Sequence, residues 1–221
     1  IYINDAVSGK LAEQAGVSIS KTADGQIVYK ATAGNGKATE FNTLQTANGE
    51  QAQVILPDGS KVFLNAASVL KYPVRFTGTE RKIELTGEGY FEVAHDRSMP
   101  FIVKTAKQAV RVLGTHFNVN SYLDEGRTIT TLEEGSVQVQ SGTICKTIRP
   151  GEQSVLTGNS ISISKADIDS ATGWKDGLFV FQDADVPTVM RQLSRWYAIE
   201  IEYNGAIPKD LFTGGISRES N

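Results

Sequence analysis

The chain has 221 residues, with 22 Lys and Arg against 25 Asp and Glu, so its formal net charge is −3. This balance argues against a nucleic-acid-binding protein, which usually carries a basic stripe, and 40% hydrophobic with 21% charged residues argues against a disordered chain. One cysteine (Cys145) and two histidines (His95 and His116) exclude an internal disulfide and are too few for a common tetrahedral zinc site, so we expect no metal or other cofactor.

The first residues, IYIND, already have the composition of a strand. No stretch approaches the roughly 18 apolar residues that a membrane-spanning helix needs. We therefore expect that this sequence is the downstream part of a longer protein.

Residues 1–172 consist mainly of short segments rich in β-branched and aromatic residues. Gly, Asp and Asn interrupt them at intervals of about 8–12 residues, which is typical of a β-sandwich or barrel. Apolar and polar residues alternate in 136–140 and 160–164, as in strands with one buried face. The pattern predicts a mostly β fold, a jelly-roll-like antiparallel sandwich. A weak similarity between residues 1–10 and 62–71 leaves a solenoid-like stack as the alternative.

Residues 173–221 have a different pattern. A strand in 177–186 precedes a helix in which Asp185 is the expected N-cap and Pro187 lies in the first turn. Alternation in the run IEIEY predicts a second strand over residues 199–203. We expect a small second domain of the α/β type, built as strand, helix, strand.

Few residues are arranged for catalysis. Glu133 and Glu134 are adjacent, so on a strand they point to opposite faces, and a solvated strand end explains them better than an acid–base pair. His116 lies among apolar residues and is expected to be partly buried. Cys145, between two isoleucines of a strand, is expected to be a small buried side chain. No nucleophile elbow or Gly-rich nucleotide loop occurs.

The pair Gly114–Thr115 allows one covalent reaction. In a strained turn the Thr115 hydroxyl could attack the preceding carbonyl and shift the acyl group from nitrogen to oxygen. The alternative is that Gly114 permits a bulge or turn before a strand threonine.

Several segments in series carry a family resemblance. These are LPDGSKVFLNAAS, TGEGYFEV, PFIVKT, VRVLGTHFNV, LEEGSVQV and RPGEQSVL. Together they resemble the FecR family of transmembrane anti-sigma regulators in its Bacteroidetes form. The run WKDGLFVFQDADVPTVMRQLSRWYAIEIEY resembles the family's C-terminal module, which is similar to the secretin and TonB short N-terminal domain.

The resemblance implies a periplasmic region, anchored in the inner membrane by a helix upstream of this fragment. Its partners would be the N-terminal signalling domain of a TonB-dependent outer-membrane transporter and, through a cytoplasmic domain absent here, an extracytoplasmic-function sigma factor. Such proteins regulate iron or glycan uptake. The C-terminal module would lack a further helix and strand. Some relatives cleave themselves at a Gly-Thr pair, which would place cleavage at Gly114–Thr115.

The expected function is therefore reception of a signal, without enzymatic turnover. The transporter domain would add a strand to the edge of the C-terminal domain. The expected contact residues are Ile199, Glu200, Ile201, Glu202 and Tyr203.

Two other functions are weighed against this one. The first is a carbohydrate-binding β-sandwich, but such modules expose aromatics in a line, whereas those of this chain are scattered among apolar residues: Tyr72, Phe76, Tyr90, Phe91 and Phe101. The second, a β-sandwich hydrolase, would need clustered acids that the sequence lacks.

Overall fold

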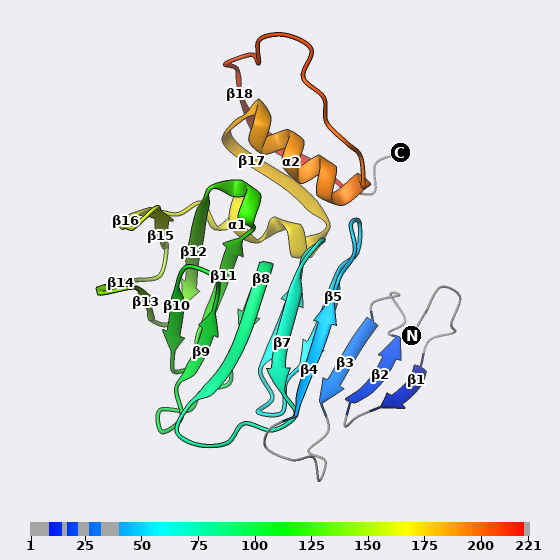
Figure 1. Ribbon diagram of the computed structural model, residues 1–221, viewed down its shortest axis with the longest axis vertical. Helices are drawn as coiled ribbons and strands as arrows, with labels where there is room; N and C mark the ends of the chain where they lie inside the picture. Colours follow the sequence, from blue (N-terminus) through cyan, green and yellow to red (C-terminus); the bar gives the residue numbers. More distant parts are fainter. Residues whose placement is uncertain (1–8, 15–16, 22–26, 32–39, 219–221) are drawn as a thin grey trace.

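The computed structural model describes residues 9–14, 17–21, 27–31 and 40–218. Figure 1 shows two parts, a large β-rich region (residues 9–165) and a smaller C-terminal unit (residues 168–218) at its upper end. The strand expected at IYIND, and most of the first copy of the weak repeat, lie outside the described residues.

The strands of the β-rich region form two sheets that share the long strand β8 (Arg81–Glu92). The first sheet runs in the order β1 (Gly9–Gln14), β2 (Val17–Lys21), β3 (Ile27–Ala31), β5 (Ala52–Ile55), β6 (Lys61–Leu64), β8, β11 (His116–Ser121), β12 (Arg127–Glu134), β15 (Glu152–Thr157) and β16 (Ser160–Lys165). The second contains β4 (Phe41–Gln45), β7 (Val69–Pro73), β8, β9 (Phe101–Lys104), β10 (Ala109–Val112), β13 (Val137–Ser141) and β14 (Ile144–Ile148). Apart from the parallel pairs β3–β5 and β8–β9, the pairing in the described part of the chain is antiparallel.

Strand β8 passes from one sheet to the other near Gly87. Its first half pairs with β7 and β9, and its second half with β6 and β11. Gly87 has φ +91°, and a Cβ there would lie 2.8 Å from the Cα of Ser68. Only glycine therefore allows the two strands to approach so closely at the crossing.

The sheets enclose one large apolar cluster. Phe91 and Phe117 stack at its centre, with ring centroids 5.0 Å apart. The aromatics that the sequence assigned to the core are there: Tyr72, Tyr90, Phe91 and Phe101 are buried, and Phe76 is partly buried against the cluster. The predicted mostly β sandwich is confirmed, and its continuous sheets curve into a nearly barrel-like form.

The expected burial of Cys145 is wrong, because this side chain is exposed. In β14 the inward positions are those of Ile144 and Ile148, which are four residues apart and so lie on one face. Cys145 lies on the other face, which nothing covers at this edge of the sheet.

The C-terminal unit contains α1 (Ile168–Thr172), the 3₁₀ turn η2 (Gly173–Asp176), β17 (Leu178–Asp185), α2 (Val186–Tyr197) and β18 (Leu211–Ser217). The predicted helix and cap are confirmed, since Asp185 Oδ1 accepts a hydrogen bond from the Thr188 amide at 2.9 Å. None of the described helices is long and apolar enough to span a membrane.

The strand expected at residues 199–203 is wrong. Ala198 ends α2 in a left-handed conformation, and residues 198–210 form a connection without strand pairing. The strand that returns is β18, which pairs antiparallel with β17. Apolar and charged residues do alternate in residues 199–203, but no described strand pairs with them, whereas β18 has β17 beside it.

Candidate partner-docking site

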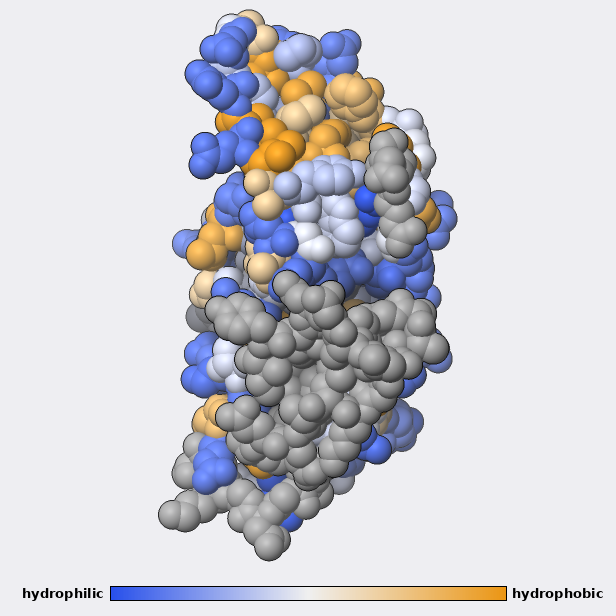
Figure 2. All heavy atoms as spheres, turned by 90° about the vertical axis from the view of Figure 1, so that its right-hand side faces the viewer, coloured by the Kyte–Doolittle hydropathy of each residue, from blue (hydrophilic) through white to orange (hydrophobic). Residues whose placement is uncertain are grey.

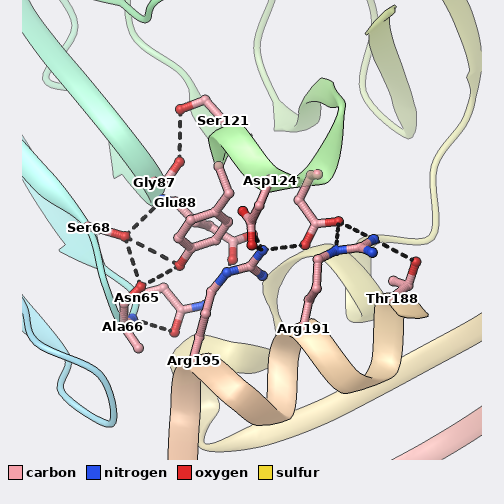
Figure 3. A network of polar contacts seen from close by, with 12 residues as sticks. Asn65, Ala66, Ser68, Gly87, Glu88, Ser121, Asp124, Thr188, Arg191 and Arg195 are labelled. Carbon is pink, nitrogen blue, oxygen red and sulfur yellow. Dashed lines mark hydrogen bonds and ion pairs between the residues drawn. The ribbon is translucent and has the colours of Figure 1, made fainter. Parts of the chain in front are cut away.

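An ion-pair network joins α2 to the β-rich region at the 3₁₀ turn η1 (Leu123–Glu125) (Figure 3). Arg195 donates through Nη2 to Asp124 Oδ1 at 2.8 Å and to Glu125 Oε1 at 2.6 Å. Arg191 donates to Glu125 Oε2 through Nε at 2.9 Å and through Nη2 at 2.7 Å. The side chains of Arg195 and Glu125 are only 12% and 8% exposed, so this contact is far less screened by water than a surface pair.

The surroundings of these two arginines stabilise their charged forms and so raise their pKa values. The hydrogen bond with Glu125 raises the pKa of Arg191. For Arg195 burial acts in the opposite direction, but its hydrogen bonds and attraction to the two acids leave its pKa raised. Its guanidinium also lies 3.9 Å from the centroid of the Tyr122 ring, a favourable cation–π distance.

Arg218, just after β18, makes a second contact with the β-rich region. Its Nη1 donates to Asn65 Oδ1 at 3.0 Å and its Nε to the Leu178 carbonyl at 3.2 Å. The guanidinium lies between the rings of Phe179 and Trp196, with centroids at 4.7 and 4.6 Å. Burial lowers the pKa of Arg218, while the negative charge of Glu88 opposes this effect.

A buried carboxylate lies beneath this contact. Glu88, on β8, accepts hydrogen bonds from Asn65 Nδ2 at 2.8 Å and from Asn118 Nδ2 at 2.9 Å. Asn118 Oδ1 in turn accepts from Trp174 Nε1 at 3.2 Å. Burial raises the pKa of Glu88, and the two amide hydrogen bonds offset this only in part. Trp174, which contacts Glu88's partner Asn118, is itself buried, with 5% of its surface exposed.

A cavity of about 490 Å³ lies between the two parts, lined on one side by Asn118 and Glu125 and on the other by Trp174 and Arg195. Its lining is largely amide, hydroxyl and charged. Among the described residues, no group of three or more His, Cys, Asp or Glu side chains could hold a metal ion.

The C-terminal unit also exposes many apolar side chains. Figure 2 shows hydrophobic residues gathered over the upper part of the molecule. We call this surface the apolar face. It consists of Tyr197, Ile199, Tyr203, Ile207, Leu211, Phe212 and Ile216, of which Leu211 and Ile216 are 60% and 58% exposed. In the described chain β18 pairs with β17 alone, so it is an edge strand beside these side chains.

Some of the predicted contact residues belong to this face. Ile199 and Tyr203 are exposed members of it, Glu200 and Glu202 are exposed, and Ile201 is half-buried. They lie in the connection after α2 and not on a strand. Sequence reasoning missed Leu211, Phe212 and Ile216 on β18, where apolar residues on both sides of the segment Thr213–Gly215 were the available indication.

The carboxylates considered for catalysis have separate partners. Glu133 accepts a hydrogen bond from the Tyr90 hydroxyl at 2.7 Å, whereas Glu134 lies 3.2 Å from His116 Nδ1. His116 is half-buried, as expected. The adjacent acids thus do not converge on one cleft.

Gly114 and Thr115 lie in a crowded segment. Gly114 has φ +154°, and a Cβ there would lie 2.6 Å from His95 Nδ1. Thr115 is buried, and its Oγ1 donates to the Ser136 carbonyl at 3.3 Å. The position therefore requires glycine, and the hydroxyl lies next to the peptide bond between the two residues.

The FecR protein model matches residues 42–138 and the FecR C-terminal model matches residues 178–221. Two crystal structures of a candidate anti-sigma factor from Parabacteroides distasonis ATCC 8503 are similar at 32% sequence identity. One has a TM-score of 0.76 over 81% of this chain and 86% of that one, and the other 0.77 over 82% and 86%. A comparison with curated proteins gave no significant match. The chain belongs to the FecR family of anti-sigma factors.

Proposed function

We propose that this chain is the periplasmic, signal-receiving region of its anti-sigma factor. Its C-terminal unit docks the N-terminal signalling domain of a TonB-dependent outer-membrane transporter. The state of that transporter is then relayed, through an inner-membrane helix and a cytoplasmic domain upstream, to an extracytoplasmic-function sigma factor. Membership of the FecR family supports the regulatory role.

The observation that carries the docking proposal is the edge position of β18, which pairs with β17 alone in the described part of the chain, together with the apolar face. An edge strand offers unpaired backbone groups to an incoming strand, and these provide affinity. Exposed apolar side chains on the same strand, chiefly Phe212 and Ile216, then provide specificity. The predicted residues Ile199, Glu200, Ile201, Glu202 and Tyr203 lie in the connection that precedes this strand, and we include them in the proposed docking surface.

The test is calorimetric titration of the chain with the signalling domain of the transporter encoded beside it. We expect Phe212→Ser with Ile216→Ser to weaken binding by about tenfold or more, because truncated contacts at the centre of an interface are the costly ones. A chain ending at Gly173 should not bind. The matched control is Ile163→Ser, which changes an exposed isoleucine on another edge strand, β16. Equal binding by all four proteins would contradict the proposal.

We infer a second, single-turnover activity at Gly114–Thr115, supported by the crowded glycine and the adjacent hydroxyl. The Thr115 oxygen attacks the Gly114 carbonyl carbon, the peptide C–N bond breaks, and the hydroxyl proton passes to the new amine. Water then hydrolyses the ester, leaving a carboxylate on Gly114.

Mass spectrometry of the purified chain tests this activity. We expect two fragments divided between residues 114 and 115, fragments retained in Thr115→Ser, and an intact chain for Thr115→Val. An intact wild-type chain after prolonged incubation would overturn the inference.

A further inference from the structure

The two parts of the molecule have separate apolar cores. One buried cluster lies between the sheets, and the other consists of Phe179, Phe181 and Val189 with the residues packed on them. Among the described residues these clusters do not merge. The surface between the two parts is instead held by polar contacts, and interfaces of that kind within a chain commonly open and close.

Two arginines on one face of α2 provide the strongest of these contacts. Both donate to Glu125, and Arg195 also donates to Asp124. Both arginines of this helix face are therefore paired with acids of the single 3₁₀ turn η1. Because Glu125 is shared, loss of one arginine leaves a poorly solvated carboxylate with half of its partners. Removing one partner of such a buried charge pair is costly, because the other charge is left without compensation. We therefore expect the two arginines to leave Glu125 together.

The remaining contacts depend on the position of α2. The carbonyl of Arg195 accepts a hydrogen bond from the Gly49 amide at 2.9 Å, and a Cβ on Gly49 would lie 2.7 Å from the Trp196 carbonyl oxygen. The end of α2 thus packs directly against the turn before β5. If the arginines leave η1 and α2 moves, the hydrogen bond between Gly49 and Arg195 and the one between Arg218 and Asn65 would break as well.

Glu88 acts against the docked arrangement. Docking places Trp174 and Arg218 over the amides that hold this carboxylate, so that it is almost fully removed from water. Desolvation of this charge is unfavourable, and the attraction of Arg218 and Arg195 offsets it only in part, since Arg218 donates to Asn65 and not to Glu88 itself. Separation of the two parts would restore water to Glu88.

We propose that Arg191 and Arg195 form a releasable latch on η1, and that the C-terminal unit exchanges between the docked arrangement of Figure 3 and an undocked one. The buried Glu88 favours release and the arginine pair favours closure. This inference goes beyond the docking of a transporter and does not depend on it, because both arrangements belong to the isolated chain.

The test measures the distance between the two parts by single-molecule energy transfer. Cys145, exposed on β14, carries one dye, and an added cysteine at Lys209→Cys, exposed before β18, carries the other. Arg191→Gln with Arg195→Gln should increase the fraction at long distance by about tenfold or more. Asp124→Asn with Glu125→Gln should do the same from the opposite side of the latch.

The matched control is Arg111→Gln, which breaks an exposed arginine–glutamate pair within the β-rich region and should leave the distances unchanged. Raising the salt concentration to about 1 M should also increase the long-distance fraction of the wild type, because it screens the partly exposed pairs. A single short distance in both latch variants, with circular dichroism of a folded chain, would overturn the proposal. So would release by only one of the two variant pairs.

Discussion

The β-rich region and the C-terminal unit solve the problem of burial in different ways. In the first, apolar side chains from two sheets meet in one continuous cluster around the stacked pair Phe91 and Phe117. In the second, one helix covers part of a two-stranded sheet, and the side chains of β18 stay exposed. The first part buries its apolar side chains in one core, and the second leaves apolar side chains along one strand exposed, a feature typical of interaction surfaces.

The difference also concerns how each part depends on its neighbour. A core as extensive as that of the β-rich region is sufficient for a domain of its size. The C-terminal unit has only three buried hydrophobic residues in its cluster and relies on polar contacts with η1 and with Asn65, just after β6. We therefore expect the C-terminal unit to lose structure first when the protein is destabilised.

The largest expected effect comes from the centre of the larger core. Phe91 is fully buried, so Phe91→Ala should lower the free energy of unfolding by about 3–5 kcal/mol through lost contacts and a cavity. Urea unfolding followed by circular dichroism measures this. Phe181→Ala, in the smaller cluster, is the comparison, and it should affect hydrogen exchange in α2 and β17 while leaving β8 protected. Equal loss of protection in both parts would mean that they unfold as one unit.

A smaller effect is expected at the junction. In Glu88→Gln one of the two oxygens becomes an amide that faces an asparagine donor, and Asn118 cannot turn without losing Trp174. An unsatisfied buried group of this kind costs about 1–3 kcal/mol. Urea unfolding at neutral pH checks the loss, and an unchanged midpoint would show that water already fills the site.

The same residue gives the stability of the wild type a pH dependence of known sign. The pKa of Glu88 in the folded chain is raised above its ordinary value of 4.5, mainly by burial. The folded protein therefore binds this proton more tightly than the unfolded one does. Its contribution to the free energy of unfolding falls as the pH rises above about 4.5, and it becomes constant above the raised pKa. In Glu88→Gln this fall should be absent when unfolding is followed from pH 4 to 8.

Local patterns made much of the fold predictable. Alternation predicted the strands of the β-rich region, and the Asp185 cap with Pro187 predicted α2, because both signals act within a few residues. The strand at 199–203 failed for the opposite reason. Whether IEIEY pairs depends on where β17 lies after the turn at Ala198, and the sequence around 199–203 does not contain that information.

The candidate site was predictable only in outline. The family resemblance directed attention to the C-terminal unit, and Ile199 and Tyr203 are exposed there. The latch could not be predicted, since Glu125 and Arg191 are 66 residues apart and only the fold brings them together. The burial of Glu88 was hidden for the same reason, because its partners come from β11 and from the turn after β6.

The smallest expected effect tests whether α2 depends on its own sequence or on the body that it docks against. Asp185→Ala removes the acceptor of the Thr188 amide and should cost about 1 kcal/mol, whereas Asp185→Asn keeps an acceptor and should cost less. The hydrogen bonds from Thr188 lower the pKa of Asp185, so the advantage of the wild type over the Asn variant should be lost as the pH falls through that lowered value. Hydrogen exchange of the first-turn amides of α2 measures both effects. If the exchange of these amides is unchanged in Asp185→Ala but rises in Arg191→Gln with Arg195→Gln, then docking and not capping holds the helix. The C-terminal unit would then lack a fold of its own when undocked.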